Sequence, residues 1–218
     1  YEAGYRYSKK AADAGDFFAS FYLAVDLYDG RGVHQNTRKA NEIFSKIYNP
    51  MFKGAQKGNP LAQYALGYMY SRGIVVAEDD EIAYRWYAES AKKNNLQAMQ
   101  ALSDCYFRGC GVAKNKQLAY KFVKMAAEKG LYPAYCDLAY LYEWGIGVDE
   151  DSENAIYYAR KAVDHGVYAA AYIVYDQYLE KNEPEKANAY FKPCFDAMIR
   201  DAENGNRDAQ TQLGHHYT

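Results

Sequence analysis

The sequence predicts an all-α fold in which antiparallel helix pairs stack into a solenoid. Motifs that begin with an alanine recur every 36 residues, at Ala62, Ala98, Ala134 and Ala170. A fixed period between about 20 and 50 residues is typical of stacked repeat proteins. Two helical patterns fit within each period, and no segment alternates apolar and polar residues as a strand does. Such arrays present long surfaces, so a binding scaffold is the first functional hypothesis and an enzyme the second.

The first helix of each unit is amphipathic. Counted from the repeat alanine as position zero, the residues at positions 0, 4 and 8 lie on one face of a helix. Position four is leucine or valine, and position eight is mostly tyrosine. Position zero holds Ala19, Ala62, Ala98, Ala134, Ala170 and Ala209. Small residues at position five, such as Gly67 and Ser103, should let a neighbouring helix approach closely.

A glycine loop follows the first helix. The pairs are Gly30 with Gly32, Gly109 with Gly111, and Gly145 with Gly147. A dinucleotide-binding loop needs a preceding strand and a third glycine, whereas each of these pairs follows a helix. Glycine here supplies the positive φ that ends a helix and turns the chain. Val75 replaces the second glycine in one unit, and we expect it to bend that loop differently.

The second helix of each unit begins at an Asx residue and ends at a glycine or asparagine. Four N-caps are predicted at Asn36, Asp79, Asn115 and Asp151. Left-handed C-terminal residues are predicted at Gly15, Gly58, Asn94, Gly130, Gly166 and Gly205. The first and last full units carry seven extra residues, which lengthens their second helices by about two turns. Pro50 and Pro193 lie in these longer segments and should kink or break them.

This register divides the chain into one continuous array. The boundaries are a partial repeat 1–18, full repeats 19–61, 62–97, 98–133, 134–169 and 170–208, and a partial repeat 209–218. The fifth unit lacks the glycine loop and is the least regular. Because both ends look like halves of further units, the array is expected to continue on both sides.

The motifs resemble the Sel1-like repeat family, a branch of the tetratricopeptide-like helical repeats. Matching residues are Ala62, Leu66, Gly67 and Tyr70, then Asp79, Ala83 and Trp86, and the loop Gly145, Gly147 and Val148. The resemblance covers nearly the whole chain. It implies a right-handed superhelix that serves as an adaptor in protein complexes, and it carries over no catalytic residues.

Composition and charge exclude several classes of function. The formal net charge is −2 and no basic stripe is present, so nucleic acid is not an expected partner. No apolar stretch approaches the roughly 20 residues that a membrane span needs. The adjacent His215 and His216 point in different directions on a helix, so no metal site is predicted. No nucleophile lies near a base in a known motif, and no catalytic residue or cofactor is predicted.

The four cysteines occupy four different repeat positions, unlike the regular cysteine pairs of some secreted relatives. Cys105 and Cys194 occupy repeat positions that hold core residues in the other units, and we expect both to be small buried residues. We expect free thiols, with a bridge between Cys105 and Cys110 as the alternative. The compartment stays open between cytoplasm and the bacterial periplasm or exterior.

The candidate binding surface consists of positions 2 and 6 of the first helices, which point away from the core face and, in the family, line a concave groove. The predicted groove residues are Phe21, Tyr64, Tyr68, Gln100, Asp104, Tyr140, Tyr172 and Asp176. Aromatic side chains on an exposed face are typical of a binding surface. The alternative is that neighbouring repeats bury them. The first helices carry seven acids against three bases, so the groove should be mildly negative.

These observations predict a non-enzymatic scaffold that binds a partner protein or peptide segment, preferably a basic one. Two other functions stay open. The first is a secreted hydrolase or small-ligand-binding protein acting on cell-wall-like substrates, as proposed for cysteine-rich relatives. The second is a structural spacer within a larger protein.

Overall fold

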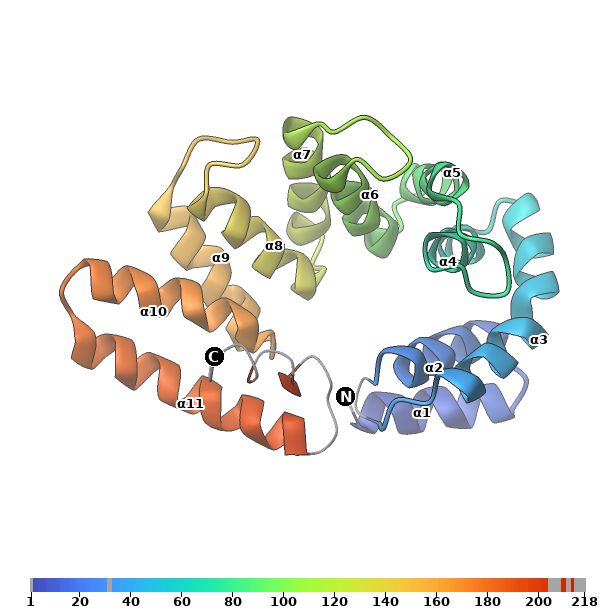
Figure 1. Cartoon of the computed structure of the whole chain (residues 1–218), viewed down its shortest axis with the longest axis horizontal. Helices are drawn as coiled ribbons and strands as arrows, with labels where there is room; N and C mark the ends of the chain where they lie inside the picture. The colour runs from blue at the N-terminus through green and yellow to red at the C-terminus, as the bar shows by residue number, and fades with distance from the viewer. Residues whose placement is uncertain (1, 31–32, 204–208, 211–212, 214–218) are drawn as a thin grey trace. The chain divides into compact units, whose positions relative to one another are not determined.

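The computed structural model describes residues 2–30, 33–203, 209–210 and 213, and over these residues the fold is all-α with no strand (Figure 1). The helices are α1 Glu2–Asp13, α2 Phe17–Asp29, α3 Thr37–Gln56, α4 Pro60–Ser71, α5 Asp80–Ala91, α6 Leu96–Arg108, α7 Lys116–Glu128, α8 Tyr132–Glu143, α9 Ser152–Asp164, the 3₁₀ turn η1 Tyr168–Ala170, α10 Ala171–Glu180 and α11 Pro184–Glu203.

The helices form two compact units, which we describe separately. Unit 1 comprises Tyr1–Asn95 and Met198–Thr218, and unit 2 comprises Leu96–Ala197. In unit 1, each of α1 to α4 packs on the next helix along the chain, and the same holds for α6 to α9 in unit 2. Consecutive pairing of this kind confirms the predicted solenoid class.

The alanines at position zero of the repeats lie in the core. Ala62, Ala98, Ala134 and Ala170 are fully or almost fully buried. The small residues at position five permit the expected close approach, because a Cβ on Gly67 would lie 2.5 Å from the ring of Tyr87. At the equivalent place in unit 2, the Ser103 hydroxyl donates a hydrogen bond to the Ala119 carbonyl at 2.8 Å. Small side chains therefore hold the two helices of a pair together.

All four predicted N-caps are confirmed. The side-chain oxygens of Asn36, Asp79, Asn115 and Asp151 each accept a hydrogen bond from a backbone amide three residues ahead, at 2.8 to 2.9 Å. These bonds satisfy donors that the first turn of a helix leaves open.

The predicted helix ends are also confirmed within the described residues. Asn94 adopts a left-handed φ of 62°, as Gly15, Gly58, Gly130 and Gly166 do at the equivalent place. Gly205 and Gly32 lie outside the described residues. In the α8–α9 loop, Gly147 has a φ of 73°, and a Cβ there would collide with the carbonyl of Lys116. This position therefore requires glycine for both its backbone conformation and its contact.

The distorted loop expected at Val75 and the helix breaks expected at two prolines do not occur. Val75 does not bend its loop by another route, because its φ of 67° is close to the 68° of Gly111 and the 73° of Gly147. Of the kink or break expected at Pro50 and Pro193, the break is absent, because α3 and α11 are each a single helix of 20 residues that includes its proline. The lengthening of these two helices is confirmed, since the other α-helices have 10 to 13 residues.

Candidate functional site

In unit 1, two of the predicted groove residues are buried and cannot line an open wall. Phe21 is fully buried, and its ring centroid lies 6.1 Å from that of Phe44 and 5.7 Å from that of Tyr68. Tyr68 is only 7% exposed. Tyr64 is half-buried between Phe21 and Tyr87, with centroid distances of 5.9 Å to each. The alternative of burial against neighbouring helices is therefore correct for Phe21 and Tyr68.

The polar tip of Tyr68 is also engaged within unit 1. Its hydroxyl lies 3.5 Å from both carboxylate oxygens of Asp29. The Arg72 guanidinium lies 5.3 Å from the ring centroid and 3.7 Å from Asp29. Tyr68 thus belongs to a packed cluster, and its ring and hydroxyl both have partners inside the protein.

In unit 2, the predicted residues are more accessible. Asp104, Tyr140 and Asp176, which share position 6, are all exposed. Gln100 and Tyr172 at position 2 are half-buried, and the Tyr172 ring packs 4.7 Å from Phe191 of α11. The candidate surface is therefore better developed on α6, α8 and α10 than on α2 and α4.

The α6 and α8 helices bring two carboxylates together. The Gln100 side-chain amide donates a hydrogen bond to Asp137 at 2.6 Å. Desolvation, followed by the charge of Asp137, raises the pKa of Asp104 to about 6, and the Arg108 cation opposes this shift. Although Asp104 is exposed to solvent, surrounding protein removes part of its hydration. Burial likewise raises the pKa of Asp137, and the hydrogen bond from Gln100 opposes it.

A second group of carboxylates joins α8 to α10. Burial and the charges of Asp176 and Glu180 raise the pKa of Glu143, while a hydrogen bond from Gln177 opposes the shift. The Glu143 Oε2 atom is shielded from solvent and has no hydrogen-bond partner among the described residues. Burial and the charge of Glu180 also raise the pKa of Asp176. An acceptor without a donor and carboxylates that repel one another both favour the approach of a cation.

We call the surface formed by these side chains the acidic face. It consists of Asp104 on α6, Asp137 and Glu143 on α8, and Asp176 and Glu180 on α10. Two exposed aromatic residues belong to the same part of unit 2: Tyr140 on α8 and Trp144 at its C-cap. Tyr140 is 45% exposed and Trp144 is 66% exposed, and their ring centroids lie 6.3 Å apart. The sequence showed the acidic excess but not this grouping, and it did not single out Trp144.

The thiols give no sign of a reactive centre. Burial and the neighbouring Asp137 raise the pKa of Cys136 to about 12, so its thiol is protonated at neutral pH. Cys105 and Cys194 are buried as expected, and none of the four cysteines forms a disulfide within the part of the chain that the structure describes.

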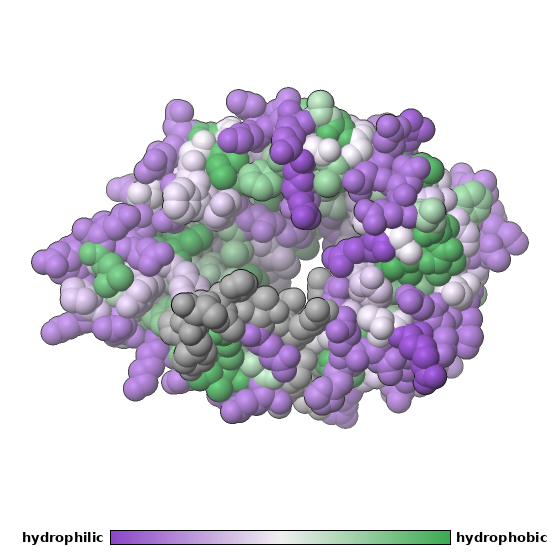
Figure 2. Space-filling model, in the orientation of Figure 1, coloured by the Kyte–Doolittle hydropathy of each residue, from purple (hydrophilic) through white to green (hydrophobic). Residues whose placement is uncertain are grey.

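The described residues hold no cluster of three or more His, Cys, Asp or Glu side chains arranged to bind a metal ion. None of their helices is long and apolar enough to cross a membrane. Figure 2 shows hydrophilic side chains over most of the visible surface, with apolar ones in small separate patches.

Comparison with protein families matches the repeat pattern directly. A family model described as the Sel1 repeat matches residues 1–16, 18–49, 60–95, 96–131 and 133–167. The chain belongs to the Sel1 repeat family. Sel1 repeats commonly mediate protein–protein interaction and are generally non-catalytic scaffolds. The matches stop before the irregular fifth unit, where η1 replaces the first turn of the helix.

Solved structures show the same Sel1 repeat fold. A Sel1 repeat protein from Oxalobacter formigenes is 24% identical over 88% of this chain and 82% of its own, with a TM-score of 0.66. A protective antigen of uropathogenic Escherichia coli is 27% identical over 98% of this chain but only 44% of its own, with a TM-score of 0.58. Protein 5086 of Pseudomonas aeruginosa is 20% identical over 91% and 74%, with a TM-score of 0.54. No curated protein matches the chain.

Proposed function

We propose that this Sel1 repeat protein is a non-enzymatic scaffold that binds a basic segment of a partner protein on the acidic face of unit 2. The observation that carries the proposal is the crowding of carboxylates on α6, α8 and α10. Their pKa values are raised because each ionised group is partly desolvated and repelled by its neighbours. A lysine or arginine side chain placed among them would relieve this repulsion.

The two exposed rings beside the acidic face would supply apolar contact. Tyrosine and tryptophan provide large contact areas with few rotatable bonds, and they are frequent among the residues that contribute most to binding. Charge alone would favour fast association, whereas Tyr140 and Trp144 would slow dissociation of the complex. The proposed surface is narrower than the sequence predicts, since Phe21 and Tyr68 are internal.

Selection from a random peptide library tests this function. We expect binders enriched in lysine and arginine, because only these side chains keep a positive charge at neutral pH. The tightest binder should lose about tenfold in affinity or more in a Tyr140→Ala, Trp144→Ala double variant, as expected when an aromatic residue important for binding is truncated. Fluorescence anisotropy of the labelled peptide measures the change.

The matched control is Tyr157→Ala, which removes a 50% exposed ring from α9 and not from the acidic face. This variant should bind like the parent. Binders of neutral or acidic composition, or equal affinity for the parent and the double variant, would refute the proposal.

A further inference from the structure

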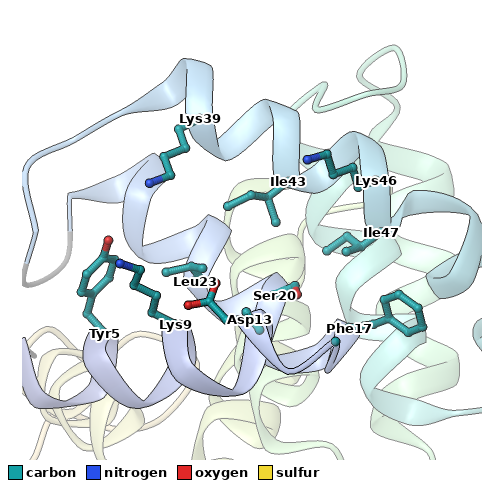
Figure 3. A pocket seen from close by; sticks show the side chains of 12 residues that line it. Tyr5, Lys9, Asp13, Phe17, Ser20, Leu23, Lys39, Ile43, Lys46 and Ile47 are labelled. Carbon is teal, nitrogen blue, oxygen red and sulfur yellow. The ribbon is translucent and has the colours of Figure 1, made fainter.

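A pocket separate from the acidic face lies in unit 1. It has a volume of about 370 Å³, is open to solvent on one side and is lined by α1, α2 and α3. Its floor is apolar: Leu23 comes from α2, and Ile43 and Ile47 come from α3. In Figure 3 these side chains lie between the helices and face the same space.

Three lysines surround this apolar floor. Figure 3 shows Lys39 and Lys46 extending from α3, while Lys9 extends from α1. All three are exposed, and none has an ion-pair partner within 4.0 Å among the residues that the structure describes. Asp13 contributes one carboxylate to the lining, so the charges sum to +2. Electrostatic complementarity therefore selects an anionic partner.

The repeat explains why the pocket exists. The helices α7, α8 and α9 repeat the spacing of α1, α2 and α3, so each pocket position has a counterpart in unit 2. Ser20 corresponds to Tyr135 and Ile43 to Tyr158, whose rings stack with centroids 6.1 Å apart. The pocket thus replaces two aromatic rings with one small and one aliphatic side chain.

Two of the three pocket lysines, Lys9 and Lys46, have lysine counterparts in unit 2, whereas the rings of Tyr135 and Tyr158 have no counterpart in unit 1. Lys46 corresponds to Lys161, whose ammonium nitrogen lies 5.5 Å from the Tyr135 ring centroid and 4.6 Å from that of Tyr157. Lys9 corresponds to Lys124, which lies 5.5 Å from the centroid of Tyr120, and the counterpart of Tyr120 in unit 1 is Tyr5, which lines the pocket. The aromatic partner of Lys9 is therefore kept in unit 1. The aromatic partners of Lys46 are lost, because Ser20 and Glu42 stand where unit 2 has Tyr135 and Tyr157.

We propose that this pocket binds an aromatic side chain from a partner protein segment that is rich in aspartate and glutamate. The ring would occupy the space that Tyr135 and Tyr158 fill in unit 2, packing against Leu23, Ile43 and Ile47. The flanking carboxylates would pair with Lys9, Lys39 and Lys46. The site is independent of the acidic face, because it lies in the other unit and selects the opposite charge.

The probe for this site is a short capped peptide with one tryptophan flanked by glutamates, labelled for fluorescence anisotropy. The parent protein should bind it, and affinity should fall as salt is added because the contacts are partly ionic. A Ser20→Tyr, Ile43→Tyr variant restores the rings found in unit 2 and should lower affinity by about tenfold or more. A Lys9→Gln, Lys46→Gln variant leaves the apolar floor intact and should weaken binding and reduce its salt dependence.

Two control variants and two control peptides test whether binding depends on this pocket and on the chemistry of the peptide. Lys53→Gln, an exposed lysine of α3 that does not line the pocket, and Asp104→Asn on the acidic face should both leave binding unchanged. Replacing the peptide's tryptophan by alanine, or its glutamates by lysines, should abolish binding.

Three results would overturn the proposal. The first is equal binding by the lysine-charged peptide. The second is unchanged binding by the two-lysine variant, which remains informative even if the ring-filling variant fails to fold. The third is equally tight binding of a free aromatic carboxylic acid, which would make the pocket a small-molecule site.

Discussion

Val75 shows how strongly the repeat fixes backbone conformation at a single residue. Its φ of 67° lies in the left-handed region, which a β-branched side chain rarely adopts. The three loops with a glycine pair have glycine at this point, so Val75 keeps the shared path of the loop at a conformational cost. Because its side chain is 45% exposed, little burial compensates for that cost.

Val75→Gly should therefore stabilise the protein. Relief of the left-handed conformation is worth roughly 1–2 kcal/mol, and the greater flexibility of glycine in the unfolded chain offsets about 0.5–1 kcal/mol. We expect a net gain of about 0.5–1 kcal/mol in the free energy of unfolding, measured by urea denaturation. Val76→Gly is the matched control: Val76 packs against the core, so its loss should destabilise. A less stable Val75→Gly variant would contradict this account of the loop.

Asp104 provides a residue-scale test of the acidic face. Its pKa in the folded protein is raised to about 6, so the ionised carboxylate disfavours folding at pH 7. That cost is present above pH 6 and disappears below about pH 4, where the group is protonated in both states. Asp104→Asn should therefore raise the melting temperature at pH 7, and its advantage over the parent should shrink as the pH falls through this window.

Thermal melts of both proteins between pH 4 and 8 measure this effect. Asp149→Asn, which removes an exposed loop carboxylate outside the acidic face, controls for the change in net charge. A constant difference between the parent and Asp104→Asn at every pH would show that Asp104 is not crowded as described.

At the scale of the element, side-chain size in the second helices decides which first-helix residues are exposed. In unit 1, Phe44 of α3 packs on both Phe21 and Tyr68, with centroid distances of 6.1 and 6.2 Å. The residue of α7 that corresponds to Phe44 is Val123, which has no ring to cover Tyr140. Helical periodicity places a residue on a face, but only the size of the facing side chain determines whether that face reaches solvent.

The position-four leucines should be the most sensitive residues of each first helix. Leu102 of α6 is 2% exposed, and Leu102→Ala would leave a cavity because close-packed neighbours collapse only partly. The expected loss is about 2–5 kcal/mol in the free energy of unfolding. Leu179→Ala on α10 is the control, since Leu179 is 42% exposed and should lose far less. Equal losses in the two variants would show that the core register is wrong.

At the scale of the whole molecule, the sequence predicts the repeat register and the helix punctuation because these depend on local chemistry. An Asx residue caps the helix that follows it, and a glycine or Asn94 ends the helix before it. Both effects depend only on neighbouring residues and not on the place of the unit in the array. The binding surface depends on contacts between helices distant in the sequence. For that reason the sequence predicts Phe21 and Tyr68 on the groove, whereas the structure buries both, and it does not predict the contact of Glu143 with α10.

The measurement that tests the central proposal most directly is the salt dependence of basic-peptide binding to unit 2. A lysine- and arginine-rich binder from the selected library is titrated against the parent and an Asp104→Asn, Asp176→Asn variant at rising ionic strength. We predict that the parent binds more tightly at low salt and loses affinity steeply as salt screens the charges, whereas the variant binds weakly with a shallow slope. Identical affinities and slopes for the two proteins would contradict a basic partner on the acidic face.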